Sequence, residues 1–215
     1  MPHSHSSIKD FQGCSRRYQQ VRVLKRFKQS ATEATTYGKL VHEGIEKYFD
    51  GGDLPDHLAR FAPYLDRIRS MDGERYCEKK LGFTRNFEPC DFFAAQVFFR
   101  GIPDLLIVNG KTAWVADWKT GKSSRFADTS QLELMAAMAM VHFPEVQGVK
   151  GMLFFLVAND IIQASYKRAD LPEILSKWTG YADQVDEMNA ENPWPAKPSG
   201  LCKFCPVTED VCEHR

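Results

Sequence analysis

The stretch GIPDLLIVNGKTAWVADWKTG, residues 101–121, carries the strongest indication of the fold of this chain. Within it, residues 102–108 are apolar and β-branched except for a proline and an aspartate, which is typical of a strand. Asn109-Gly110 is the strongest short signal for a type I′ hairpin turn, and residues 111–118 form the returning strand. The stretch therefore predicts an antiparallel β-hairpin.

Three charged side chains gather on one face of this hairpin. With the turn at 109–110, Asp104 faces Val115, and the side-chain period of two brings Asp104, Asp117 and Lys119 to one face. The two carboxylates are then diagonal neighbours, roughly 7–8 Å apart at Cβ. They can converge on one hard divalent ion, Mg²⁺ or Mn²⁺, with the lysine beside it to orient a water or neutralise charge. The alternative is a surface ion pair between Asp117 and Lys119.

The same residues carry a resemblance to a known family. Pro103-Asp104 followed by Asp117-Trp118-Lys119 resembles the signature of the PD-(D/E)XK nucleases. The resemblance implies that Asp104, Asp117 and Lys119 are catalytic and that the Trp118 carbonyl is an extra metal ligand.

Three further motifs, in the family's order, extend this resemblance over nearly the whole chain. They are the segment 7–18 (SIKDFQGCSRRY), the Gly38-x3-His42 pattern and a C-terminal cysteine cluster, which together resemble the RecB-like and CRISPR-associated exonucleases. The implied fold is α/β, a restriction-endonuclease-like core with a central mixed β-sheet flanked by helices and a cysteine-stapled C-terminal tail. Pattern alone predicts only an α/β fold with a mixed sheet.

Periodicity and turn signals place the other elements. We expect helices over 7–20, opened by a Ser7–Asp10 capping box, and over 36–49, 55–70, 128–141 and 170–190. We expect strands over 75–83, 92–100, 149–158 and 161–167 besides the hairpin. The implied organisation is a nuclease domain over 1–195, with a helical N-terminal region over 1–72, a sheet core over 73–168 and a C-terminal helix over 169–191. Residues 196–215 form a metal-cluster clasp with Cys14.

Composition is that of an ordinary soluble globular protein. The chain has 215 residues, 43% of them hydrophobic and 26% charged, so it is long enough for one sizeable core. No apolar run reaches 18 residues, and the start MPHSHSSIKDF lacks a signal-peptide pattern. These features indicate a cytoplasmic protein without a membrane span, whose six cysteines are thiols or metal ligands rather than disulfides.

Charge is balanced overall, with a formal net charge of zero, but it is unevenly distributed. Residues 7–30 hold seven basic side chains against the single acid Asp10. This stretch is either a solvated helix face or a phosphate-contacting patch that includes Arg16 and Arg17. Lys122 and Arg125, just after the Asp-x-Lys motif, are further candidates for DNA phosphate contacts.

Three other side chains enter the candidate site through the resemblance. His42 would be a metal ligand, against the alternative of an ordinary core histidine. Glu78, expected in strand 75–83, would help to hold the metal or orient water, against the alternative of an exposed strand residue. Gln131 would steady the region of the catalytic lysine; the family's Gln-x3-Tyr motif has Met135 in place of tyrosine here, so only the glutamine carries over.

The cysteine spacing Cys202-x2-Cys205-x6-Cys212 is a ligand-type pattern. Together with Cys14 it resembles the AddB-type nucleases and CRISPR adaptation exonucleases, which implies a 4Fe–4S cluster that holds the two termini together. A zinc knuckle made with His214 is the local alternative, and free thiols in a disordered tail are the third. Either metal would be structural, because the tail has no core of its own.

The leading hypothesis is a metal-dependent DNA exonuclease acting on single strands or DNA ends, as in the stand-alone nucleases of phages and mobile elements. The chain has no G-x4-G-K-[ST] motif, so unwinding would come from a partner such as a helicase, a recombinase or a single-strand annealing protein. The alternatives are a CRISPR adaptation nuclease that trims prespacer ends and a non-catalytic DNA-binding or assembly module. The sequence gives no signal for an oligomer.

Overall fold

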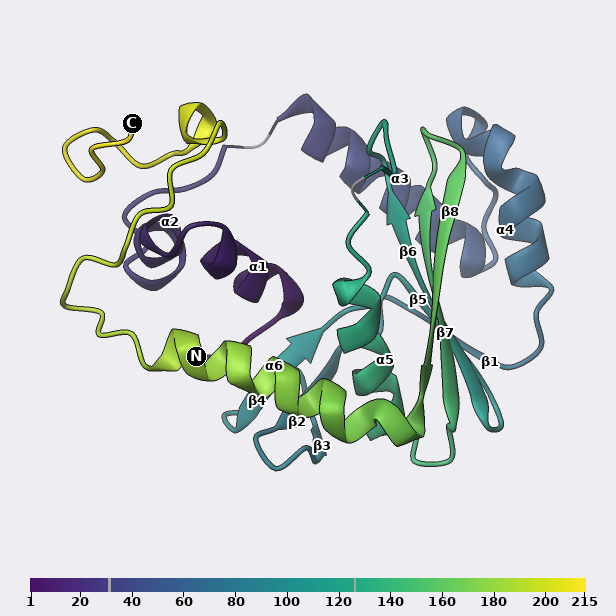
Figure 1. The fold of residues 1–215 in the computed structure, drawn as a ribbon. Coiled ribbons are helices and arrows are strands. Elements are labelled where there is room, and N and C mark those ends of the chain that lie inside the picture. Colours follow the sequence, from purple (N-terminus) through teal and green to yellow (C-terminus); the bar gives the residue numbers. More distant parts are fainter. Residues whose placement is uncertain (31, 126) are drawn as a thin grey trace. The chain divides into compact units, whose positions relative to one another are not determined.

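The computed structural model describes residues 1–30, 32–125 and 127–215 (Figure 1). By their contacts, the residues divide into two compact units. We call Met1–Pro2 with Thr32–Leu175 the core unit, and His3–Ala31 with Ser176–Arg215 the terminal unit. No helix among the described residues is long and apolar enough to cross a membrane.

A five-stranded sheet with the order β1-β5-β6-β7-β8 forms the centre of the core unit. Its strands are β1 (Glu74–Cys77), β5 (Leu105–Asn109), β6 (Thr112–Lys119), β7 (Gly148–Phe155) and β8 (Asp160–Lys167). β6 and β7 are parallel and the other neighbours are antiparallel. The expectation of an α/β fold with a mixed central sheet is therefore confirmed.

Helices cover both faces of this sheet (Figure 1). One face packs against α3 (Glu33–Phe49), the 3₁₀-helix η2 (Asp56–Phe61) and α4 (Ala62–Arg69) in a single apolar cluster. The other face packs against α5 (Ser130–His142), which is so closely seated that a Cβ on Gly151 of β7 would lie 2.9 Å from Leu132. α6 (Leu171–Asp186) follows β8 after the short 3₁₀-helix η3 (Arg168–Asp170).

A second, three-stranded sheet with the order β3-β2-β4 interrupts the chain between β1 and β5. It consists of β2 (Leu81–Thr84), β3 (Pro89–Cys90) and β4 (Val97–Gly101). Phe83 and Phe99 are fully buried and stack with their ring centroids 5.5 Å apart.

The expected single strand 75–83 is wrong, because the chain leaves one sheet for the other within it. β1 ends at Cys77, and Glu78 adopts a left-handed backbone with φ of 46°, which no strand tolerates. β2 then begins at Leu81 in the three-stranded sheet. The expected strand 92–100 is likewise shorter, as β4, and follows an irregular segment.

The hairpin forms, but its turn lies one residue later than expected. Asn109 pairs with Thr112, so the two loop residues are Gly110 and Lys111. Gly110 has φ of 55° at the first loop position and Lys111 has no positive φ at the second, as in a type II′ rather than a type I′ turn. Asn109 belongs to the ladder, and its side-chain amide donates to the carbonyl of Asp72 at 3.3 Å.

This register brings the two hairpin carboxylates closer than the expected diagonal arrangement. Leu105 pairs with Ala116, and continuing that register places Asp104 opposite Asp117 instead of opposite Val115. The pairing has slipped by two residues, and a slip of two keeps the same side chains on the same face. The expected face is therefore correct even though the expected pairing is not.

Two further expectations about the helices are corrected. The first helix, α1 (His5–Gly13), is capped by Ser4 and not by Ser7, whose side chain instead returns the capping-box bond. On α3, the helical spacing predicts that Leu40, Val41 and Ile45 all face inward; Val41 and Ile45 are buried, but Leu40 is 54% exposed.

The terminal unit joins the two ends of the chain through side-chain contacts to backbone. It contains α1, α2 (Ser15–Tyr18), the π-helix η1 (Gln19–Val23), the end of α6 and the 3₁₀-helix η4 (Cys202–Phe204). The Gln19 amide donates to the carbonyls of Ala190 and Asn192, at 3.0 and 2.7 Å. The rings of Tyr18 and Trp194 stack 5.9 Å apart, so an aromatic contact supplements these hydrogen bonds.

Truncating a side chain on the buried side of α3 should lower the free energy of unfolding far more than truncating one on its exposed side. Ile45→Ala should lower the free energy of unfolding by about 2–5 kcal/mol, because it opens a cavity at a fully buried site. Leu40→Ala on the same helix should change it by less than about 0.5 kcal/mol. Urea denaturation followed by circular dichroism measures both, and equal losses would contradict the orientation of α3.

Candidate metal centre

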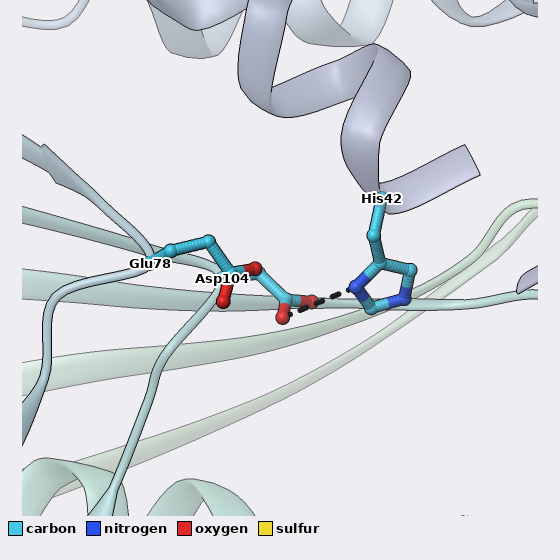
Figure 2. A group of neighbouring side chains, drawn as sticks. All are labelled: His42, Glu78 and Asp104. Atoms are coloured by element: carbon cyan, nitrogen blue, oxygen red, sulfur yellow. Dashed lines mark ion pairs between the residues drawn. The ribbon is translucent and has the colours of Figure 1, made fainter. Parts of the chain in front are cut away.

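Three side chains from separate elements converge beside the end of the hairpin (Figure 2). They are His42 from α3, Glu78 directly after β1 and Asp104 directly before β5. One ligand atom from each lies within 4.8 Å of the others, and this is the one such group that could hold a metal ion within the described parts of the chain. We call these residues the ligand trio.

His42 is held by an acceptor at each ring nitrogen. Its Nδ1 lies 3.3 Å from Asp104 Oδ1, and its Nε2 lies 2.9 Å from the carbonyl oxygen of Trp118. The hydrogen bond to Asp104 raises the pKa of His42, although burial opposes it. Asp104 Oδ2 in turn accepts from the Trp118 backbone N–H at 2.7 Å. The Trp118 peptide therefore fixes both side chains.

Glu78 owes its place to an unusual backbone conformation. A left-handed φ in a non-glycine residue costs of order 1 kcal/mol or more and is concentrated at functional sites. Here the Glu78 N–H donates to the Asp104 carbonyl at 3.2 Å, which ties the two acids together. Burial, followed by the negative charge of Asp104, raises the pKa of Glu78 to about 7.

Asp117, Lys119 and Gln131 form a second group beside the trio. Asp117 is 6% exposed, its Oδ1 accepts from the Gln131 side chain, and its Oδ2 lies 2.5 Å from Lys119 Nζ. Lys119 Nζ also donates to Gln131 Oε1 at 2.8 Å, so the three side chains close a ring of contacts. Burial and the charge of Asp104 raise the pKa of Asp117, while Lys119 opposes the rise.

The donor set fits a hard divalent cation. One imidazole and two carboxylates are the ligands that Mn²⁺ and Mg²⁺ accept in mixed nitrogen and oxygen sites. The raised pKa values of Glu78 and Asp117 report crowded, partly desolvated negative charge. A bound cation would relieve that repulsion.

The structure brings most of the expected site residues together, in a different grouping. Glu78, and not Asp117, completes the ligand trio, because both Asp117 oxygens face Gln131 and Lys119. The Trp118 carbonyl, an expected ligand, accepts from His42. Lys122 and Arg125 lie in the exposed loop after β6. Sequence reasoning missed the backbone turn at Glu78, for which no glycine or asparagine gave a signal.

The glycine of the Gly38-x3-His42 pattern has a local explanation. A Cβ at Gly38 would lie 3.3 Å from Thr120 Oγ1, so α3 approaches the chain just beyond Lys119 very closely there. One helical turn later, that approach allows His42 to reach Asp104 and the Trp118 carbonyl.

The four cysteines expected to bind a cluster line a single small cavity in the terminal unit. Cys14, Cys202, Cys205 and Cys212 all border it, although they are up to 198 positions apart in sequence. Cys14 sits at an extended break between α1 and α2, with φ of −164°.

The two expected DNA contacts of the terminal unit have partners within that unit. Arg16 donates to the carbonyls of Trp194 and Val211, at 2.5 and 2.9 Å. Arg17 forms an ion pair with Asp10 at 3.2 Å. Arg16 therefore fastens the tail, and its role as a phosphate contact remains a prediction.

The chain belongs to the PD-(D/E)XK nuclease superfamily, whose family model matches residues 2–213. Two solved structures share its fold at low sequence identity. A protein described as a candidate exonuclease from Eubacterium rectale has a TM-score of 0.53 at 13% identity, over 98% of this chain and 92% of the other. The structure of SSO0001 has a TM-score of 0.52 at 14% identity, over 95% and 83%. No curated protein matches the chain by sequence.

The raised pKa of Glu78 predicts how pH affects the metal-free protein. Between about pH 4.5, the ordinary value, and about 7, the folded state binds more protons than the unfolded state, so stability falls as pH rises. Thermal unfolding in EDTA across this range should show a falling Tm, and Mn²⁺ should oppose the fall. Glu78→Gln should make the fall shallower, whereas Glu173→Gln on α6 should leave it unchanged. An identical slope in the wild type and Glu78→Gln would contradict the raised pKa.

Proposed function

We propose that this protein is a divalent-metal-dependent DNA exonuclease that hydrolyses phosphodiester bonds in single-stranded DNA or at DNA ends. Its setting would be phage recombination, repair or DNA degradation. The observation that carries the proposal is the meeting of the ligand trio with Asp117, Lys119 and Gln131 at one end of the hairpin. Membership of the nuclease superfamily supports the same reaction class.

In this proposal His42, Glu78 and Asp104 hold the cation, with Asp117 as a further ligand. A bound Mg²⁺ or Mn²⁺ would supply Lewis-acid stabilisation of negative charge on the phosphate. The Trp118 peptide keeps Asp104 and His42 aligned through hydrogen bonds on both sides, and so positions the trio before the cation arrives.

Lys119 acts on the attacking water and on the phosphate. Its ammonium lies between Asp117 and Gln131, so it is held as a fixed positive charge able to orient the attacking water and stabilise charge that develops on the phosphate. Gln131 is a positioning residue, because it contacts both Lys119 and Asp117. In the hydrolysis, the water oxygen loses a proton and bonds to phosphorus. The bond from phosphorus to the leaving oxygen breaks, and the leaving oxygen receives a proton.

Substitutions in this group should slow cleavage without unfolding the protein. Lys119→Gln should lower the rate roughly 10²–10³-fold, as does the loss of one charge-stabilising donor, and Gln131→Ala roughly 10–100-fold. The assay is shortening of end-labelled single- and double-stranded DNA with Mn²⁺, with Mg²⁺ and in EDTA. Asp53→Asn, in an exposed loop, is the control and should cleave normally.

Three results of that assay would lead to different conclusions about the function. Metal-dependent shortening from an end, lost in Lys119→Gln, supports the exonuclease. Internal cuts would make the protein an endonuclease. A folded wild type that binds DNA but does not cleave it with either metal would overturn the proposal and leave a binding module.

We further propose a 4Fe–4S cluster in the cysteine cavity of the terminal unit. Zinc held by four tetrahedral ligands needs thiolate sulfurs about 3.8 Å apart, given its bond length of about 2.3 Å. Among the residues that the structure describes, no three cysteine or histidine ligand atoms of the tail lie within 4.8 Å of one another. Four cysteines around one cavity at wider spacing suit a multi-iron cluster better than a single zinc ion.

Metal analysis tests this assignment directly. Protein purified without oxygen should contain iron and acid-labile sulfide in equal amounts, and Cys14→Ser should lose most of both. Cys77→Ser, a matched change of a thiol in the core unit, should keep them. Stoichiometric zinc without iron would establish the zinc alternative.

A further inference from the structure

The three-stranded sheet is inserted between two members of the ligand trio. β2 begins at Leu81, three residues after Glu78, and β4 ends at Gly101, three residues before Asp104. Leu81 and Gly101 pair with each other, so the same end of this sheet lies next to both acids. Three residues span at most about 10 Å, which fixes this small sheet directly beside the candidate metal centre.

This segment, residues 79–101, is unusually rich in aromatic rings and in positive charge. It holds six of the chain's 15 phenylalanines, and four basic residues against two acids, Glu88 and Asp91. Phe83 and Phe99 form its buried side. Phe98, which is also buried at 8% exposed, and the partly exposed Arg100 lie on either side of Phe99 in β4 and share the opposite face.

On and around that face, cations lie over aromatic rings. The three pairs are Arg85 over Phe98 at 4.7 Å, Arg100 over Phe92 at 4.7 Å, and Lys80 over Phe93 at 5.3 Å. Lys79, the neighbour of Glu78, lies 3.7 Å over the ring of Tyr76.

Two of the phenylalanines expose part of their rings to solvent, although each also meets a neighbouring ring edge-on, Phe87 against Phe83 and Phe93 against Phe92. Phe93 is 74% exposed and Phe87 is 37% exposed. Phe87 also has φ of 63°, a conformation that a bulky side chain rarely adopts, at the tip of the turn between β2 and β3. Exposed rings beside cations favour a ligand that offers flat apolar faces together with negative charge.

We propose that this small sheet is the surface along which single-stranded DNA approaches the candidate metal centre. Unpaired bases would stack on Phe93 and Phe87, while Lys80 and Arg85 contact the phosphates. Base stacking on aromatic side chains combined with a basic track is how single strands are bound without sequence preference. In a duplex the base faces are already stacked, so this surface selects single strands.

The proposal deepens the proposed function and rests on it for the position of the active site. Binding can nevertheless be measured without cleavage, in EDTA, with the full chain and a fluorescent oligothymidylate. A failure of binding is thereby separated from a failure of catalysis.

Stacking on exposed rings predicts a loss of affinity that is specific to single strands. Phe93→Ala should weaken Kd for the oligothymidylate roughly tenfold, since one stacked base is lost, and should change duplex binding much less. Tyr64→Ala, which removes a 43% exposed ring from α4, is the matched control and should bind as the wild type does.

Phosphate contacts by the basic side chains predict a different signature. Lys80→Gln should reduce the slope of log Kd against log salt concentration by about 0.7, the amount for one phosphate contact on a single strand, whereas Phe93→Ala should leave the slope unchanged. Lys150→Gln, an exposed lysine on β7, is the control.

The outcomes separate cleanly. Loss of single-strand affinity in Phe93→Ala, with a reduced slope in Lys80→Gln, supports the surface even if the wild type cuts no DNA. Wild-type binding by both variants overturns it, even if the protein is an active nuclease. Equal losses for single strands and duplex would also overturn it, because stacking would then play no role.

Discussion

Mutual repulsion among closely spaced carboxylates, of which Asp117 is buried and Asp104 and Glu78 are partly buried, is the constraint on which the rest of the core unit depends. Asp104 and Asp117 face each other at the end of the hairpin, and Glu78 is tied to the Asp104 backbone. Such a group is unfavourable unless positive charge is held beside it. Lys119 supplies that charge through its contact with Asp117, and in the metal-free protein His42 supplies it to Asp104 when its imidazole is protonated, which the hydrogen bond to Asp104 favours.

The helices on the two faces of the sheet place the side chains that offset this repulsion. α3 brings His42 from one face of the sheet, and α5 brings Gln131 from the other face to hold Lys119 against Asp117. Apolar burial on both faces of the sheet stabilises this arrangement. The polar groups lie at the end of the sheet, where strand pairing stops. The apolar core makes the sheet rigid, and the candidate metal centre lies at the end of that sheet.

The terminal unit buries several apolar side chains of its own, among them Ile8, Tyr18, Trp178 and Trp194, but its tail is held in a different way. Its tail has one short 3₁₀-helix, and it is fastened by side chains that donate to backbone carbonyls, above all Arg16 and Gln19. Four cysteines around one cavity are consistent with this arrangement, since a segment with no core of its own needs a cross-link to stay ordered.

The hairpin, the shared face of Asp104, Asp117 and Lys119, and the mixed α/β fold could be predicted from the sequence, because side-chain period and turn residues are local properties. The sequence did not determine the exact strand pairing, since a slip of two residues preserves every facing side chain. It also did not show that Leu40 is exposed or that the backbone reverses at Glu78. The grouping of Glu78 with His42 and Asp104 is visible only in the folded chain, because it depends on a strained turn and on helix packing across the sheet, and neither leaves a local pattern in the sequence.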